Sequence, residues 1–133
     1  MDRTNVRASL RIVGECFDVQ RVTDTLEVTP SRTWNKGEPI RNSGKNYTCT
    51  TWIYATESVE SQDINTSIKE IEELFYAKTD MIAALKKQYE LYVSIDICIM
   101  IENGEPPAIY FEPEFIKFAA EIDATIDVDT YVN

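Results

Sequence analysis

The segment Leu91–Ile101, which reads LYVSIDICIMI, alternates between aliphatic and other residues along its whole length. All its odd-numbered positions are aliphatic, and the even-numbered positions between them are Tyr92, Ser94, Asp96, Cys98 and Met100. Successive side chains of a strand point to opposite faces, so this pattern predicts a long strand with one buried and one wetter face. The fold must therefore contain a sheet that is covered on one side.

Two other segments alternate in the same way. Apolar residues occupy every second position of Val6–Val13, which ends at Gly14, and Thr125–Val132 places Ile126 and Val128 on one side with acidic residues on the other. Because burial on one side recurs in three strands, we expect the helices to lie on a single face of the sheet.

The segments between these strands carry helix and strand signals in turn. Apolar residues at helical spacing, with Asp18 or Pro113 at a start, predict four helices. We expect them at 19–26, before the stop at Thr29-Pro30, and at 63–76, 79–89 and 113–122. Further strands are expected at 32–36, 47–56 and 108–111, the last joined to Leu91–Ile101 by a tight hairpin turn at Asn103-Gly104. The expected fold class is α+β: a two-layer sandwich with a mixed, largely antiparallel sheet of five to six strands and helices packed on one face.

Length and composition favour one folded domain over residues 1–133. The chain is 44% hydrophobic, which is enough apolar surface to offset the entropy lost on folding. No apolar run approaches the length of a membrane span, and residues 1–5 do not begin a signal peptide, so we expect a cytoplasmic protein without a membrane partner. The cysteines, Cys16, Cys49 and Cys98, are widely spaced, and we expect buried reduced thiols rather than a disulfide framework or zinc site.

Charge is distributed unevenly along the chain, whose net charge is −10. Residues 1–50 carry eight Lys or Arg against six Asp or Glu, whereas residues 51–133 carry five against seventeen. This excess of negative charge repels polyanions, so nucleic acid is not an expected partner. A basic protein partner is electrostatically favoured, although acidity also serves solubility alone.

The chain lacks the residues that most enzymes need. It has no histidine, which removes the commonest general base, the usual catalytic triads and most transition-metal sites. Gly44-Lys45 is not followed by Ser or Thr, so a phosphate-binding P-loop is absent. A carboxylate pair such as Asp127 and Asp129 is the remaining catalytic possibility, but acids on an open sheet face are expected to stay hydrated and ordinary. We expect no catalytic residue, cofactor or metal.

The wetter face of the predicted sheet is the first candidate site. It would combine charges of both signs with aromatic rings, as protein interfaces do at their centres. The candidate binding residues are Arg7, Arg11, Tyr92, Asp96, Asp127, Asp129 and Tyr131, together with Trp52 and Tyr54 or their neighbours. If the first and last strands are adjacent, the arginines and aspartates would form exposed cross-strand ion pairs instead.

A second candidate site surrounds Trp34. A small molecule would be held near Arg32, Trp34, Lys36 and Trp52. The alternative is structural: the indole of Trp34 would close the edge of the core, with Pro30 and Gly37 shaping turns.

Three stretches of the chain resemble a known family. Thr29–Gly37, which reads TPSRTWNKG, resembles the Pro-x-x-x-Trp-x-x-Gly signature of bacterial domain of unknown function family 4279, and Phe111–Phe115 with Ile126–Tyr131 resembles its closing helix and acidic last strand. Members usually turn into that strand through a glycine, whereas Asp123-Ala124 occupies the place here, so the turn must be built without easy access to positive φ unless Asp123 adopts it. The resemblance implies a fold and carries over no activity.

Two hypotheses for function follow from these observations. The first is a non-catalytic bacterial protein-protein interaction module, of which an immunity-type inhibitor of a basic toxin is one form, or a homodimer formed through the same face. The second is a small-molecule-binding or sensor domain. A carboxylate-based hydrolase is the third, weakest alternative.

Overall fold

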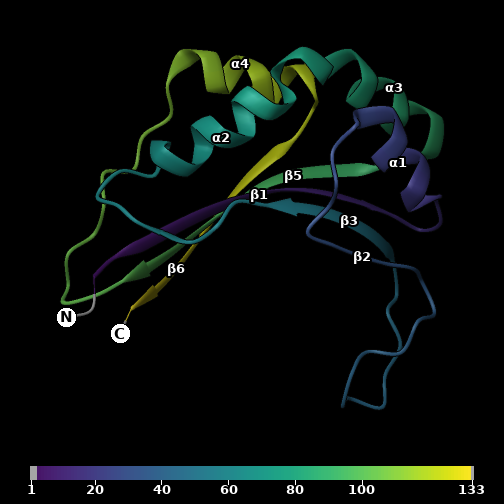
Figure 1. Cartoon of the computed structure of the whole chain (residues 1–133), viewed down its shortest axis with the longest axis horizontal. Coiled ribbons are helices and arrows are strands. Elements are labelled where there is room, and N and C mark those ends of the chain that lie inside the picture. The colour runs from purple at the N-terminus through teal and green to yellow at the C-terminus, as the bar shows by residue number, and fades with distance from the viewer. Residues whose placement is uncertain (1–2, 133) are drawn as a thin grey trace.

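The fold consists of one sheet and a layer of helices on one of its faces (Figure 1). The computed structural model describes residues 3–132. The strands are β1 (Asn5–Gly14), β2 (Arg32–Trp34), β3 (Thr50–Ala55), β4 (Val59–Glu60), β5 (Tyr92–Ile101) and β6 (Thr125–Val132). The helices are α1 (Val19–Leu26), α2 (Asn65–Phe75), α3 (Thr79–Tyr89) and α4 (Pro113–Glu121), and the 3₁₀ turn η1 (Tyr76–Lys78) joins α2 to α3.

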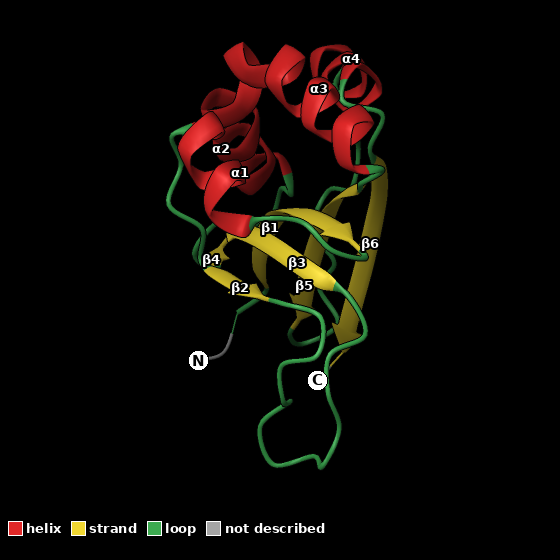
Figure 2. Ribbon diagram, turned by 90° about the vertical axis from the view of Figure 1, so that its right-hand side faces the viewer, coloured by secondary structure: helices red, strands yellow, loops and turns green. Residues whose placement is uncertain are grey.

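The strand order is β2-β3-β1-β5-β6, and β4 pairs with the beginning of β1. All neighbours are antiparallel except β5 and β6, which are parallel and connected through α4. Figure 2 shows the helices together above the sheet, and no helix among the described residues covers its other face. The predicted α+β class, with a mixed, largely antiparallel sheet and helices on one face, is confirmed.

The core lies between this sheet and the helices. β1 and β5 lie side by side in the sheet. Every second residue from Val6 to Ile12 in β1 and from Val93 to Ile99 in β5 is buried against the helices. Helices α2 and α4 contribute Ile68, Ile71, Phe75, Phe115 and Phe118. Because full burial of one such side chain is worth about 1.5–3 kcal/mol, this layer accounts for most of the favourable free energy of folding.

Three local features at helix ends and turns have the expected structural roles. The Asp18 carboxylate accepts a hydrogen bond from the Gln20 amide at 3.0 Å and caps α1. Pro113 occupies the first turn of α4. Asp123 has φ of 49°, so it supplies the left-handed turn into β6 for which a glycine would be the usual residue.

The predicted hairpin after β5 is wrong. Asn103 and Gly104 do turn, with φ of 55° and 68°, but Ala108 instead forms an isolated parallel bridge with Asp63. Both sides of β5 are already paired, with β1 and β6, so no edge is left for a returning strand. Pro106 and Pro107 also lack the N–H groups that such a strand would donate.

Helix α1 ends at Leu26, before Pro30 could interrupt it. Glu27 adopts φ of 55° and its N–H donates to the Thr23 carbonyl at 2.8 Å, which closes the helix at Leu26. None of the helices among residues 3–132 is long and apolar enough to cross a bilayer.

Candidate functional site

The open face is the sheet surface turned away from the helices. The register aligns its side chains in three rows that run across the strands. In strand order, the rows are Arg32, Ile53 and Arg11; then Ala55, Ser9, Asp96 and Asp127; and then Arg7, Cys98 and Asp129. The alternation in β1, β5 and β6 therefore positions the predicted sheet-face residues on one surface.

The middle of the open face is hollowed. This hollow has a volume of about 730 Å³ and is lined by side chains from β1, β2, β3, β5 and β6. Its lining consists of Arg7, Ser9, Arg11, Ser31, Arg32, Ile53, Ala55, Asp96, Cys98, Asp127, Val128, Asp129 and Tyr131. Tyr92 belongs to the same face but lies outside the hollow, and its hydroxyl is 2.7 Å from the Thr125 hydroxyl.

Charges of opposite sign line opposite halves of the hollow. Arginines from β1 and β2 form one half, and aspartates from β5 and β6 form the other; we call them the arginine half (Arg7, Arg11, Arg32) and the aspartate half (Asp96, Asp127, Asp129). The first and last strands are not neighbours, because β5 lies between them, so the expected cross-strand ion pairs do not form. Within residues 3–132, no arginine of the arginine half takes part in an ion pair.

Asp96 is an acid of the hollow whose pKa is shifted by its surroundings. It is half-buried in β5, opposite Ser9 on one side and Asp127 on the other. Burial raises the pKa of its carboxyl, and nearby Asp127 raises it further, whereas the Ser94 hydroxyl and the Arg11 guanidinium act in the opposite direction. Asp96 is therefore held in the hollow at some cost in free energy when it is ionised.

Replacing Asp96 with asparagine should raise the free energy of unfolding at pH 7. An acid whose pKa is raised in the folded state destabilises the protein above that pKa, and this cost vanishes as the pH falls below the unfolded value of about 3.9. The gain of Asp96→Asn should therefore shrink between pH 7 and pH 4. Urea unfolding of both proteins across this range checks it, and a gain that grows toward low pH would contradict the assignment.

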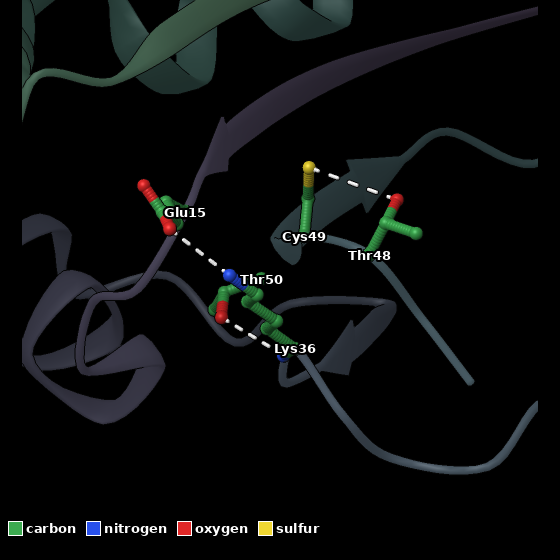
Figure 3. A network of polar contacts seen from close by, with 5 residues as sticks. All are labelled: Glu15, Lys36, Thr48, Cys49 and Thr50. Atoms are coloured by element: carbon green, nitrogen blue, oxygen red, sulfur yellow. Dashed lines mark hydrogen bonds and ion pairs between the residues drawn. The ribbon is translucent and has the colours of Figure 1, made fainter.

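The second predicted group does not form one site. Arg32 lines the hollow and thus joins the first group. Trp52 is fully buried on the helix side of the sheet, where its indole N–H donates to the Thr23 hydroxyl at 3.0 Å, so it cannot contact a surface ligand. Lys36 lies in the loop after β2 and pairs with Glu15 at 3.0 Å (Figure 3). This contact raises the pKa of Lys36 and lowers that of Glu15.

Trp34 is on the open face, so the expectation that it closes the core edge is wrong. It lies opposite Thr51 and stacks on Tyr47, with ring centroids 4.6 Å apart. The guanidinium of Arg32 lies 5.3 Å from the Trp34 ring centroid, a cation–π distance. A cation–aromatic stack of Arg32, Trp34 and Tyr47 therefore adjoins the arginine half of the hollow.

The cysteines are less buried than expected. Cys16 is exposed, while Cys49 and Cys98 are half-buried, and all three are free thiols. Cys98 lines the hollow, and Cys49 receives a weak contact from the Thr48 hydroxyl at 4.0 Å (Figure 3). The prediction of reduced thiols without a disulfide holds for the described cysteines, but their predicted burial does not.

Two acids of the aspartate half lie in the open at the edge of the sheet. Asp127 and Asp129 follow each other on one face of β6 and are both exposed. Among residues 3–132, no cluster of three or more Cys, Asp or Glu is arranged to hold a metal ion. The site offers fixed charges and hydrogen-bonding groups on a broad surface.

A comparison with protein-family models finds the family that the short motifs resemble. The model of the family described as domain of unknown function (DUF4279) matches residues 4–133. The chain belongs to this family. Searches of the curated proteins and of the solved structures found no match to this DUF4279 chain.

Sequence reasoning missed several members of the hollow, of which Arg32 is the charged one. The sequence alone places Arg32 in a separate ligand region. Arg32 lines the hollow because β2 pairs with β3 and sets it beside Ile53, and this register depends on a contact between segments that are distant in sequence. The only available signal was the short alternation Arg32-Thr33-Trp34, which puts Arg32 and Trp34 on one face of a strand.

Proposed function

We propose that this DUF4279 chain is a non-catalytic protein-binding module and that its partner docks on the open face. The observation that carries the proposal is the division of the hollow into an arginine half without ion pairs and an aspartate half. Charged groups left unpaired in one concave surface are available to a partner whose own charges are arranged in the complementary order.

The breadth of the site favours a protein over a small molecule. Ligand pockets are mostly apolar and enclose most of their ligand, whereas this hollow is mostly polar, carries six charged side chains and spans five strands. Its aromatic neighbour Tyr131 is 53% exposed at the rim, and tyrosine and arginine are the residues on which interfaces depend most.

Net charge indicates the kind of partner. At −10, the chain attracts a basic protein over long range and accelerates the encounter. On contact, the aspartate half would receive lysine or arginine side chains, and the arginine half would receive carboxylates that fix the orientation. An immunity-type inhibitor that neutralises a basic toxin is the form of this function that we favour.

A small-molecule sensor is the second candidate, and one observation favours it. The stack of Arg32 on Trp34 and of Trp34 on Tyr47 gives a flat aromatic surface beside a cation, which suits a planar anionic ligand. Such a ligand would occupy the edge of the open face rather than its centre.

Co-purification with a blocked variant tests the proposal. Ser9 lies at the centre of the hollow, so Ser9→Tyr should fill it without changing charge, and Ala84→Tyr is the control on the exposed side of α3. The tagged wild-type chain and the control should recover the same protein from host cells, and Ser9→Tyr should not. Recovery by Ser9→Tyr equal to wild type, or loss in the control alone, would contradict docking on the open face.

A further inference from the structure

Strand β6 forms an open edge of the sheet. In the part of the chain that the structure describes, it pairs with β5 alone, and every one of its residues except Ile126 is exposed. The opposite edge, β2, is only three residues long and continues into the long loop that projects below the sheet in Figure 2. The eight-residue β6 is therefore the edge at which another strand has room to pair.

The sequence of β6 does not block such pairing. TIDVDTYV is rich in β-branched residues and contains no proline, glycine or lysine, the residues that commonly protect sheet edges. The outward N–H and C=O groups of an edge strand have no ladder partner, so they are available to an extended segment.

Charge opposes pairing between two copies. Two β6 strands could pair antiparallel about a twofold axis at residue 127, 128 or 129. Each of these three registers places an aspartate of one copy directly opposite an aspartate of the other, either Asp127 or Asp129. Such facing like charges destabilise the pair. The same two carboxylates, side by side on one face of β6, would instead attract lysine or arginine at alternate positions of an incoming strand.

The other face of β6 supplies an apolar contact. Val128 and Val132 are 38% and 72% exposed and occupy the even-numbered positions of the strand, whereas the aspartates occupy odd-numbered ones; Val128, at the edge of the sheet, also borders the hollow. An incoming strand whose apolar residues alternate with its basic ones would cover these valines on one face and meet the aspartates on the other.

We propose that β6 binds an extended segment of a partner protein, in which lysine or arginine alternates with apolar residues, as an added strand of the sheet. The inference rests on the proposed function and specifies how part of the partner is held. Main-chain hydrogen bonds would provide the pairing, and the alternation of charge would select the segment.

Synthetic peptides test the strand addition with the full chain. The probe is a fluorescent eight-residue peptide in which lysine alternates with valine, and the control replaces its lysines with glutamates. Two further probes carry N-methyl groups on the lysine amides or on the valine amides. A strand pairs through one edge only, so one methylated peptide should lose about tenfold or more in affinity and the other should not.

Matched variants locate the site by fluorescence anisotropy. Asp127→Lys with Asp129→Lys should weaken binding of the lysine peptide by about tenfold or more, whereas Glu114→Lys with Glu121→Lys, exposed on α4 and equal in charge change, should weaken it far less. Equal binding of both methylated peptides, equal effects of the two double variants, or no binding up to about 1 mM would each overturn the proposal.

Two outcomes separate this inference from its alternatives. If the wild-type chain sediments as a dimer that Asp127→Lys with Asp129→Lys disrupts, then a second copy occupies the edge and the proposal is wrong. If Ser9→Tyr loses the natural partner while the lysine peptide fails to bind, the proposed function stands and only the strand addition falls.

Discussion

Replacing Trp52 with alanine is expected to lower the free energy of unfolding by about 3–5 kcal/mol, the usual cost of removing a buried aromatic side chain. Trp52 is fully buried, and its ring packs edge-on against Phe75 with centroids 6.3 Å apart. The substitution would leave a cavity between β3 and α2 and would remove the indole donor from the Thr23 hydroxyl. Urea unfolding followed by circular dichroism measures the change.

The second tryptophan of the chain is the matched control. Trp34 is half-buried on the open face and packs against Tyr47 rather than the core, so Trp34→Ala should cost about 0.5–1.5 kcal/mol, the value of one aromatic pair. Equal losses in the two variants would contradict the placement of Trp52 inside and Trp34 outside.

The elements of the fold were predictable because their signals are local. The alternation in Leu91–Ile101 identifies β5, Asp18 caps α1, and Asp123 adopts the positive φ that was one of the two ways to build the turn before β6 without a glycine. The face assignment of β1 and β5 followed from their alternation of buried and less buried residues, and β6 follows the same alternation of residue types although its residues are almost all exposed. These features account for six of the seven residues first assigned to the sheet face, which line one hollow.

The arrangement of the elements was not predictable for a physical reason. Strand order depends on contacts between residues far apart in sequence, so the insertion of β5 between β1 and β6 left no local trace. The face of Trp52 was equally hidden, because Thr50–Ile53 of β3 are all buried and the period of two is lost there. The turn at Asn103-Gly104 is a local signal, whereas the pairing of β5 with β1 and β6 on both sides, which excludes the hairpin, is not.

A large loss of partner binding is expected when charges of the arginine half are reversed. Arg7→Glu combined with Arg32→Glu should weaken partner binding by about 2–5 kcal/mol, or at least about 30-fold in Kd, because the partner's carboxylates would face like charges. Arg11 is left in place because its charge lowers the pKa of Asp96, and its loss would disturb the hollow itself.

A matched double variant separates local contact from overall charge. Arg21→Glu with Arg41→Glu changes the net charge by the same amount at exposed positions of α1 and the β2–β3 loop, away from the hollow. A basic partner attracted only by total charge would bind both double variants more tightly than the wild-type chain. Docking on the open face requires the two variants to behave differently.

Isothermal titration of the recovered partner into the wild-type chain and these two double variants tests the central claim most directly. The open-face account predicts that Arg7→Glu with Arg32→Glu loses affinity, while Arg21→Glu with Arg41→Glu binds as well as the wild-type chain or better. Tighter binding by both variants, or equal loss in both, would contradict the assignment of the open face as the binding surface.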